Sequence, residues 1–399
     1  MMAMKTVIGR QTNMPESIDP NDVPKELQEL RKKIDDLDNS ILDLLAQRKA
    51  VVTEVAGVKK ELSLKVRDRV RETEILEARR DRCHTLGLHT EVIESLYRVV
   101  LTASRDQQAS LGTEVPHNLP KKNIAVIGGR GAMGRMFAQL FTELGQNVEV
   151  ADLETKRSPK EAARDADMVI ISVPMSVTEE VIREVAPLVK PSGLICDLTS
   201  IKTKPIQAMC ESATCNVIGL HPMFGPNVHT LQEQRVVYVP ARVAPDSEWN
   251  TWLRTCLLAR GFNLVDSTAE EHDKTMSIVQ VLTHFSTEVL GLSMARAGVS
   301  VEETLRFASP VYLIDMVMTA RHFCQSPDLY GSIHLSNPNA KEVVAGFKES
   351  LNAWQLAVEK GDLVAFEQLF AETHDFFGDV SEHAMEQSTY LIDRLIERG

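Results

Sequence analysis

The chain has 399 residues, of which 43% are apolar and 25% charged, and its formal net charge is −12. These values predict a soluble protein of two or three globular domains. The acidic balance argues against a nucleic acid or an anionic membrane surface as partner, and no apolar run approaches the length of a membrane-spanning helix. The six cysteines form no C-x-x-C pair and no cysteine–histidine metal spacing, so we expect buried thiols in a reducing cytoplasm and no metal site.

The N-terminal part of the chain is predicted to be helical. Residues 1–22 are polar and lack the apolar segment of a signal peptide, which indicates a disordered extension. In residues 23–110 apolar side chains recur at spacings of three and four, a period typical of helices. The expected helices are a first of nearly forty residues, which should need a packing partner, a second from Arg69 to about Thr85, and a third from about Thr90 to Gln108.

One basic residue lies within the apolar seam of the first predicted helix. The heptad register places Arg48 there, where an arginine is costly unless an anion pairs with it. Lys59 lies about 16 Å further along the helix, whereas Arg31 and Lys59 are roughly 42 Å apart. A two-fold dimer would let Arg31 of one chain complete a site built on Arg48 and Lys59 of the other. The alternative interpretation is three surface charges on a coiled-coil-like helix.

Four segments of the helical module form a recognisable pattern: Leu30-Arg31-x-x-Ile34-Asp35-x-Leu37-Asp38, Leu45-Ala46-x-Arg48, Val55-Ala56-x-x-Lys59 and Val66-Arg67-Asp68-x-x-Arg71-Glu72. With them the module resembles the all-helical chorismate mutases over about residues 25–110. The resemblance implies a domain-swapped helical dimer that rearranges chorismate to prephenate without a nucleophile, by preorganised electrostatics.

The same resemblance implies a role for each polar position of the mutase module. Arg31 and Arg48 would hold the two substrate carboxylates by forked pairs. Lys59 and Gln108 would donate to the ether oxygen as negative charge builds there, although the register leaves the adjacent Gln107 open as an alternative to Gln108. The remaining implied positions are Asp68 and Glu72, which would place the ring hydroxyl, and the substrate contacts Arg71 and Ser104.

A glycine-rich signature follows residues 111–121, which carry two prolines and are predicted to be a linker. An apolar strand pattern precedes Gly129-x-Gly131-x-x-Gly134, and a helical pattern follows it. Such glycines allow a tight turn and a close approach to a pyrophosphate at the helix N-terminus, and the alternative is a tight turn without ligand. Asp152, at the end of the next predicted strand, would take the ribose hydroxyls and favour NAD over NADP by charge, although Lys156 and Arg157 follow closely.

Strands and helices alternate in residues 122–266, which predicts an α/β, Rossmann-type, doubly wound parallel sheet. Ligands bind beyond the carboxyl ends of such strands. The predicted strands are Ile124–Ile127, Val148–Ala151, Met168–Ser172, Leu194–Asp197, Val217–Leu220 and Val236–Val239. The predicted cofactor contacts are Gly129, Arg130, Gly131, Met133, Gly134, Asp152, Ser172, Val173 and Pro174.

His221 is the candidate base of this crevice. It directly follows a predicted strand, and Ser200 lies at the neighbouring strand end. These residues by themselves predict NAD(P)-linked oxidation of an alcohol, with the histidine accepting the hydroxyl proton. The alternative is a histidine without a catalytic role.

Several segments of residues 122–399 form a second recognisable pattern: Ile127-Gly128-Gly129-x-Gly131-x-Met133-Gly134, Ser200-Ile201-Lys202, Gly219-Leu220-His221-Pro222-Met223-Phe224-Gly225-Pro226, Glu271-His272-Asp273, Gln280-x-x-x-His284-Phe285, Ser309-Pro310, Arg321 and Ser326-Pro327-x-Leu329-Tyr330. With these segments, residues 122–399 resemble prephenate dehydrogenase. One position departs from the pattern, because Leu313 stands where a basic residue is expected, and this puts a secondary anion contact in doubt.

This second resemblance implies that His221, oriented by Ser200, accepts the hydroxyl proton of prephenate while a hydride passes to NAD. Loss of CO2 then aromatises the ring. Arg321 would pair with a substrate carboxylate. Further substrate contacts would come from Lys202, His272, His284 and Tyr330, each of which has ordinary packing as its alternative role.

Taken whole, the chain is similar to the bifunctional chorismate mutase/prephenate dehydrogenases of bacterial tyrosine synthesis. Residues 267–399 are predicted to be an all-helical domain for substrate binding and dimerisation, so both halves of the chain indicate a homodimer. Tyrosine, the end product, is a reasonable feedback effector. The alternative function is arogenate dehydrogenase with a helical module that only dimerises or regulates, since no residue distinguishes the substrate amine from the ketone.

Overall fold

A computed structural model describes residues 24–62, 64, 66–111, 119–228 and 230–396. These residues form two compact units, one within residues 18–272 and the other within 273–399. The predicted extension at residues 1–22 and most of the predicted linker lie outside the described residues. No helix in the described part of the chain is long and apolar enough to cross a membrane.

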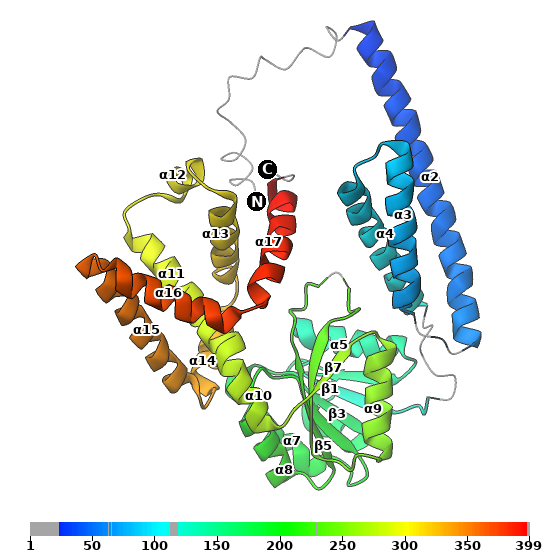
Figure 1. The fold of residues 1–399 in the computed structure, drawn as a ribbon. Coiled ribbons are helices and arrows are strands. Elements are labelled where there is room, and N and C mark those ends of the chain that lie inside the picture. Colours follow the sequence, from blue (N-terminus) through cyan, green and yellow to red (C-terminus); the bar gives the residue numbers. More distant parts are fainter. Residues whose placement is uncertain (1–23, 63, 65, 112–118, 229, 397–399) are drawn as a thin grey trace. The chain divides into compact units, whose positions relative to one another are not determined.

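The N-terminal module consists of the three predicted helices (Figure 1). Asp68 caps the second helix by accepting a hydrogen bond from the backbone N–H of Arg71 at 2.9 Å, and Gly87 ends it with a left-handed φ of 67°. The first helix buries only Val52 and Ala56, whereas Leu37 remains 65% exposed, so most of its apolar seam lacks a cover within one chain. The helices are α2 (Lys25–Glu61), α3 (Arg69–Leu86) and α4 (Thr90–Ser110).

A seven-stranded sheet forms the centre of the nucleotide-binding part, with the order β2-β1-β3-β4-β5-β6-β7. The predicted doubly wound sheet is confirmed, with one strand whose direction the sequence interpretation did not foresee: β6 runs antiparallel to β5. The described residues between these two strands contain no helix, and a parallel partner would need a crossover connection. The strands are β1 (Asn123–Ile127), β2 (Asn147–Ala151), β3 (Met168–Ile171), β4 (Leu194–Asp197), β5 (Asn216–Pro222), β6 (Arg235–Arg242) and β7 (Asn263–Asp266).

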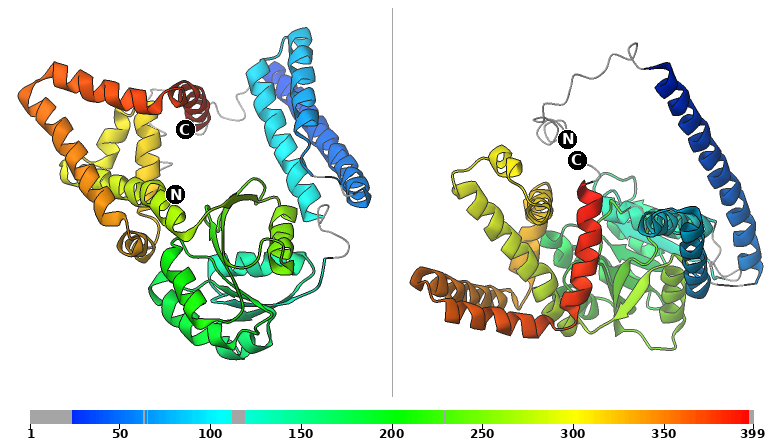
Figure 2. Two further views of the ribbon diagram at one scale, coloured as in Figure 1. Left: turned by 60° about the horizontal axis from the view of Figure 1, so that its bottom comes forward. Right: turned by 45° about the horizontal axis from the view of Figure 1, so that its top comes forward.

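Both faces of the sheet are covered by helices (Figures 1 and 2). One face packs an aromatic core in which Phe141 stacks on Trp252 with ring centroids 5.9 Å apart. The other face packs smaller aliphatic side chains. The helices are α5 (Ala132–Glu143) and α9 (Glu248–Ala259) on the aromatic side, and α6 (Pro159–Asp165), α7 (Met175–Val185) and α8 (Thr203–Ser212) on the other.

The C-terminal unit is helical throughout its described residues, as predicted. Its helices α15 and α16 pack together (Figure 2). Gly361 ends α15 with a left-handed φ of 61°. The chain reaches this unit through α10 (Ala269–Met276) and a π-helical stretch η2 (Ser277–Leu282). The helices that follow are α11 (Thr283–Arg296), α12 (Val301–Arg306), α13 (Pro310–His322), α14 (Pro327–Ser336), α15 (Ala340–Lys360), α16 (Leu363–Phe377) and α17 (Val380–Ile396).

Candidate active sites

The glycine-rich turn joins β1 to the N-terminus of α5 and leaves no room for side chains at its glycines. A Cβ on Gly134 would lie 2.7 Å from the carbonyl oxygen of Gly128, so the helix packs directly on the turn. Gly128 has a φ of 77°, and a Cβ there would lie 2.5 Å from the carbonyl oxygen of Ser172, just beyond β3. The structure therefore brings the predicted contacts of the turn and of the β3 end together at the switch point between β1 and β3.

Asp152 lies at the end of β2 beside this turn. One of its carboxylate oxygens accepts the backbone N–H of Arg130 at 3.2 Å, and the side chain of Arg130 pairs with Glu154 at 2.9 Å. The guanidinium of Arg157 pairs with Glu149 and Asp165. These carboxylates offset the positive charge of Arg157, which would otherwise weaken a preference for NAD. A helix N-terminus with a carboxylate one strand away is a donor and acceptor set that fits a pyrophosphate and a ribose.

His221 lies within β5 and is 2% exposed, whereas the sequence placed it just after the strand. That boundary was wrong because β6 pairs with β5 up to Pro222, with His221 opposite Val237. Its Nδ1 lies 2.8 Å from Nε2 of His272 on α10, and the two rings meet edge to face. The sequence had assigned the orienting role to Ser200, which is half-buried beyond β4, and had assigned His272 to the substrate.

Lys202, which was predicted to contact the substrate, is fully buried. Its ammonium pairs with the equally buried Asp197 at the end of β4 and donates to the carbonyl oxygen of Leu220 at 2.9 Å. Leu220 directly precedes His221 in β5. Lys202 thus ties the ends of two strands together beneath the candidate base, and Asp197 is the partner that sequence reasoning missed.

In the mutase helices, Arg48 of α2 and Ser104 of α4 meet in a hydrogen bond. The buried Gln108 lies one turn further along α4, and its amide donates to the carbonyl oxygen of Ser104 at 3.2 Å. Gln107 instead reaches back to α2, where it donates to the carbonyl oxygen of Lys49 at 3.0 Å. Arg48, Ser104 and Gln108 therefore share one face, which favours Gln108 over Gln107 as the site residue.

Lys59 and Glu72 occupy the loop end of α2 and the first turn of α3. The ammonium of Lys59 donates to the carbonyl oxygen of Val66 at 2.6 Å. Glu72 pairs with Arg105 and, at 3.4 Å, with Arg67. The sequence analysis gave neither arginine a function, although Arg67 stands within one of the segments that carry the resemblance.

The other predicted mutase residues have different surroundings. Asp68 acts as the cap of α3, and Arg71 is exposed and pairs with Glu74 at 2.9 Å. Arg31 is exposed on α2 and lies four heptads before Lys59 along this helix. Within one chain the structure does not join Arg31 to the group around Arg48.

In the C-terminal unit, His284 of α11 meets Tyr330 of α14 edge to face, with ring centroids 4.8 Å apart. Burial, followed by the nearby imidazoles of His322 and His334, lowers the pKa of His284 to about 4. Burial also raises the pKa of Tyr330. Arg321 and Leu313 lie on α13, the former exposed and the latter half-buried.

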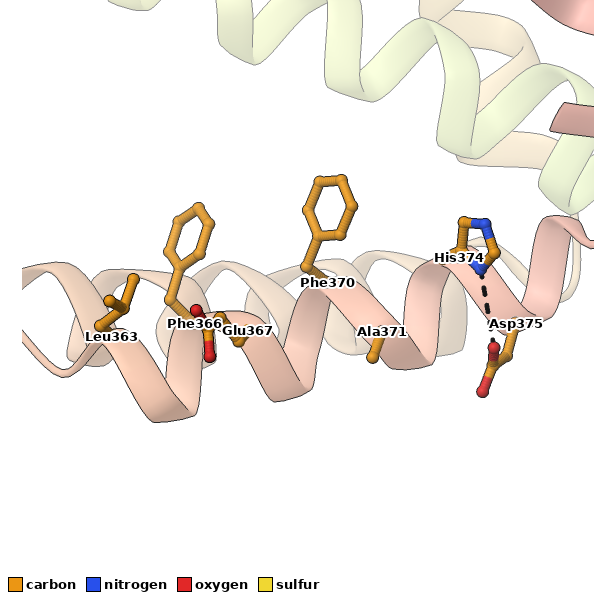
Figure 3. A pocket seen from close by; sticks show the side chains of 7 residues that line it. All are labelled: Leu363, Phe366, Glu367, Phe370, Ala371, His374 and Asp375. Atoms are coloured by element: carbon orange, nitrogen blue, oxygen red, sulfur yellow. Dashed lines mark ion pairs between the residues drawn. The ribbon is translucent and has the colours of Figure 1, made fainter. Parts of the chain in front are cut away.

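A shallow hollow follows the surface of α16 and contains none of the predicted site residues. Figure 3 shows Phe366, Phe370 and His374 on one side of this helix, and His374 lies 3.6 Å from the carboxylate of Asp375. Phe370 is 61% exposed. An exposed aromatic row on one helix lacks the convergent polar groups of a catalytic site and is typical of a packing surface.

Comparison with protein families matches three consecutive regions of the chain. The descriptions are chorismate mutase type II for residues 30–109, prephenate dehydrogenase nucleotide-binding domain for residues 138–261, and prephenate dehydrogenase dimerization domain for residues 268–372.

Two curated relatives match nearly the whole chain. A T-protein of Enterobacter agglomerans is 34% identical over 369 residues, and a T-protein of Haemophilus influenzae is 31% identical over 368 residues. Each alignment covers 92% of this chain and 97% of the relative. Among solved structures, a prephenate dehydrogenase from A. aeolicus in complex with hydroxyphenyl propionate and NAD+ is similar in fold, with a TM-score of 0.53 and 17% identity over 65% of this chain and 99% of that one.

The mutase helices, the glycine-rich crevice with its buried histidine and the helical C-terminal unit thus appear in the same order as the matched domains. The chain belongs to the T-protein family, in which a chorismate mutase precedes a prephenate dehydrogenase.

Proposed function

We propose that this chain converts chorismate to prephenate on its N-terminal helices and then oxidises and decarboxylates prephenate with NAD. The domains that carry these steps are residues 23–110, 122–266 and 267–399. For the second step the main support is the buried pair of His221 and His272 at the nucleotide crevice. For the first it is the face shared by Arg48, Ser104 and Gln108.

In the mutase step, Arg48 and Arg31 bind the two carboxylates of chorismate, and Ser104 holds the Arg48 guanidinium in place. Lys59 and Gln108 donate to the ether oxygen, where negative charge builds as the C–O bond breaks. Arg105 and Arg67 pair with Glu72 and orient its carboxylate toward the ring hydroxyl. Since Arg31 lies roughly 42 Å from Lys59 along one helix, the partner subunit's Arg31 completes each site.

In the dehydrogenase step, His221 accepts the hydroxyl proton of prephenate at Nε2. For Nε2 to accept this proton, the proton of the neutral ring must be on Nδ1, which then donates to Nε2 of His272. His272 thereby fixes both the tautomer and the ring orientation of His221, and Ser200 is the second residue proposed to orient it. Lys202 contributes by holding the strand end that carries His221.

The cofactor is held by the glycine-rich turn, the N-terminus of α5 and Asp152. When bound, NAD supplies the acceptor for the hydride that leaves the carbinol carbon. Arg321 pairs with a carboxylate of prephenate, and His284 and Tyr330 contact the remainder of the substrate. The neutral state of His284 lets it serve as a hydrogen-bond donor or acceptor without adding charge.

Two single variants test the assignment of the activities. We expect Lys59→Ala to abolish consumption of chorismate and to leave NAD-linked oxidation of prephenate within about twofold, because the lysine acts only on the ether oxygen. His221→Asn is expected to abolish NAD-linked oxidation of prephenate and to leave consumption of chorismate within about twofold. Each variant is the folding control of the other, and mutase activity that survives in Lys59→Ala contradicts the assignment of the first site.

Selectivity for NAD is attributed to Asp152. Its carboxylate accepts from the ribose hydroxyls and repels the extra phosphate of NADP. Asp152→Asn should therefore raise kcat/KM for NADP relative to NAD, with Glu154→Gln, which exchanges the neighbouring carboxylate, as the matched control. An unchanged ratio in the Asp152 variant would refute this role.

The choice between prephenate and arogenate follows from the fusion, since a mutase on the same chain releases prephenate. Initial rates with the two substrates test it, and a strong preference for arogenate would overturn the choice. The chain is further proposed to act as a cytoplasmic homodimer through α2 and the C-terminal helices, whose apolar residues are exposed in one chain. Tyrosine is the effector to test first in inhibition assays.

A further inference from the structure

One carboxylate oxygen in the C-terminal unit accepts hydrogen bonds from two imidazoles. Oε1 of Glu288, on α11, lies 3.1 Å from Nε2 of His322 on α13 and 3.2 Å from Nε2 of His334 on α14. His322 is buried, and Glu288 and His334 are partly buried. No role in either reaction has been given to these three residues, which we call the Glu288 cluster.

The hydrogen bonds of the cluster indicate which ring nitrogen of each histidine carries the proton. Nδ1 of His334 is buried and has no hydrogen-bond partner among the described residues. A proton there would leave a buried N–H unpaired, so the proton of His334 lies on Nε2, which donates to Glu288. His322 also presents Nε2 to the carboxylate and donates in the same way. Both imidazoles thus donate to one oxygen of Glu288, which fixes the orientation of the two rings.

The cluster holds the two side chains assigned to prephenate in this unit. The ring of His322 stacks on Tyr330, with centroids 3.7 Å apart and planes 18° from parallel. Tyr330 in turn meets His284 edge to face. His284 also lies against His322, with centroids 5.4 Å apart. A rotation of His322 would therefore release both Tyr330 and His284.

We propose that Glu288 is a positioning residue of the dehydrogenase: through His322 and His334 it fixes the rings of Tyr330 and His284 in the orientation that binds prephenate. This inference depends on the proposed substrate contacts of Tyr330 and His284. Because Glu288 acts on ground-state binding, its loss affects KM for prephenate more than kcat and leaves KM for NAD unchanged.

The test compares two substitutions of Glu288. Glu288→Leu removes the acceptor and keeps much of the volume, so KM for prephenate should rise about tenfold with kcat within about threefold. Glu288→Gln retains an acceptor oxygen and should restore KM to within about threefold of the parent. Glu302→Leu, at an exposed glutamate of α12, is the matched control and should leave KM unchanged.

A double-mutant cycle with Tyr330 separates this inference from the proposed function. Tyr330→Leu should raise KM for prephenate, and adding Glu288→Leu should then raise KM by a smaller factor than it does in the parent, because part of the effect of the carboxylate passes through the Tyr330 ring and the rest through His284. If Tyr330→Leu and His284→Leu both leave KM unchanged, the proposed substrate contacts are wrong. If Tyr330→Leu raises KM but Glu288→Leu does not, or if their effects multiply, only the positioning role is wrong.

Thermal unfolding of the C-terminal unit checks that Glu288→Leu folds. Should it fail to fold, His322→Leu replaces it in the same assay, since this change removes both the hydrogen bond and the ring that stacks on Tyr330. A rise in KM for prephenate then supports the proposal, and a KM equal to that of the parent overturns it.

Discussion

The buried polar side chains around the candidate base form specific pairs. His221 is paired with His272, and Lys202 with Asp197. A buried charge without its partner costs far more than the pair contributes, so such groups must be matched during folding. The pairs explain why polar residues that look interchangeable in the sequence have distinct structural roles.

Lys202 provides a direct test of this dependence. Lys202→Met should lower the free energy of unfolding of the nucleotide-binding part by about 3 kcal/mol, because it leaves the Asp197 carboxylate buried and unpaired. The double variant Asp197→Leu/Lys202→Met should recover part of this loss. Denaturant unfolding followed by tryptophan fluorescence in a Trp354→Phe background measures this loss of stability. In that background Trp249 and Trp252 report on the core of the nucleotide-binding part alone.

Lys204→Met, two residues further along at an exposed position, is the control for removing a lysine. A Lys202→Met variant as stable as this control would show that the ion pair does not anchor the strand end.

The low pKa of His284 predicts a pH-dependent stability of the C-terminal unit. The pKa of His284 is about 4 in the folded chain, and its ordinary value is 6.5. Between pH 4 and pH 6.5 the unfolded chain therefore takes up a proton that the folded chain does not. Stability is therefore complete above about pH 6.5 and is lost as the pH falls toward 4. Fluorescence of Trp354, the tryptophan of this unit, follows the thermal transition at pH 7 and pH 5.

His284→Gln removes the titrating group and should flatten this dependence. His374→Gln, at an exposed histidine of α16, should not change it. Identical pH dependence in the parent and His284→Gln would mean that another group causes the acid loss.

At the level of secondary structure elements, α2 determines the geometry of the mutase. Its 37 residues keep Arg31 far from the group that contains Arg48 and Ser104. Mixing Arg31→Ala chains with Arg48→Ala chains should regenerate one intact site per heterodimer, since one site inherits both defects and the other neither. Either homodimer alone should lose roughly 3 kcal/mol or more of transition-state stabilisation.

The assay is chorismate consumption after subunit exchange, and a label on one chain verifies the exchange. Two differently labelled Arg31→Ala preparations, mixed in the same way, give the activity expected of exchange without complementation. If the Arg31/Arg48 mixture exchanges but remains inactive, the shared-site mechanism is wrong.

Other elements show how far sequence patterns reach. The three helices of residues 23–110 and the glycine-rich turn were predicted with boundaries close to those of the structure, because a helical period and a tight turn depend on neighbouring residues. β7 was not predicted, since Asn263 and Asp266 frame only two apolar residues. The direction of β6 was not predicted either, because strand pairing is a long-range property.

At the scale of the whole molecule, the two activities should depend on different dimer contacts. Leu37 is 65% exposed in one chain, and its replacement by aspartate would place a charge in the seam of α2. Leu37→Asp is expected to reduce mutase activity at least tenfold while the chain stays dimeric through its C-terminal helices and still oxidises prephenate. Analytical ultracentrifugation and the two assays measure these outcomes.

Asp36→Ala, at the exposed neighbouring position, is the control for Leu37→Asp. Loss of both activities together, or a purely monomeric Leu37→Asp chain, would mean that α2 rather than the C-terminal unit maintains the dimer.

The sequence by itself determined the order of the domains, the nucleotide-binding turn and the chemical types at both sites. Those features depend on short-range spacing: glycines within one turn, and a basic residue in the apolar seam of one helix. The tertiary structure decided which polar groups act on each other. His221 and His272 lie 51 positions apart and Glu288 and His334 lie 46 apart, so only the packing of their strand and helices could bring these side chains within hydrogen-bonding distance.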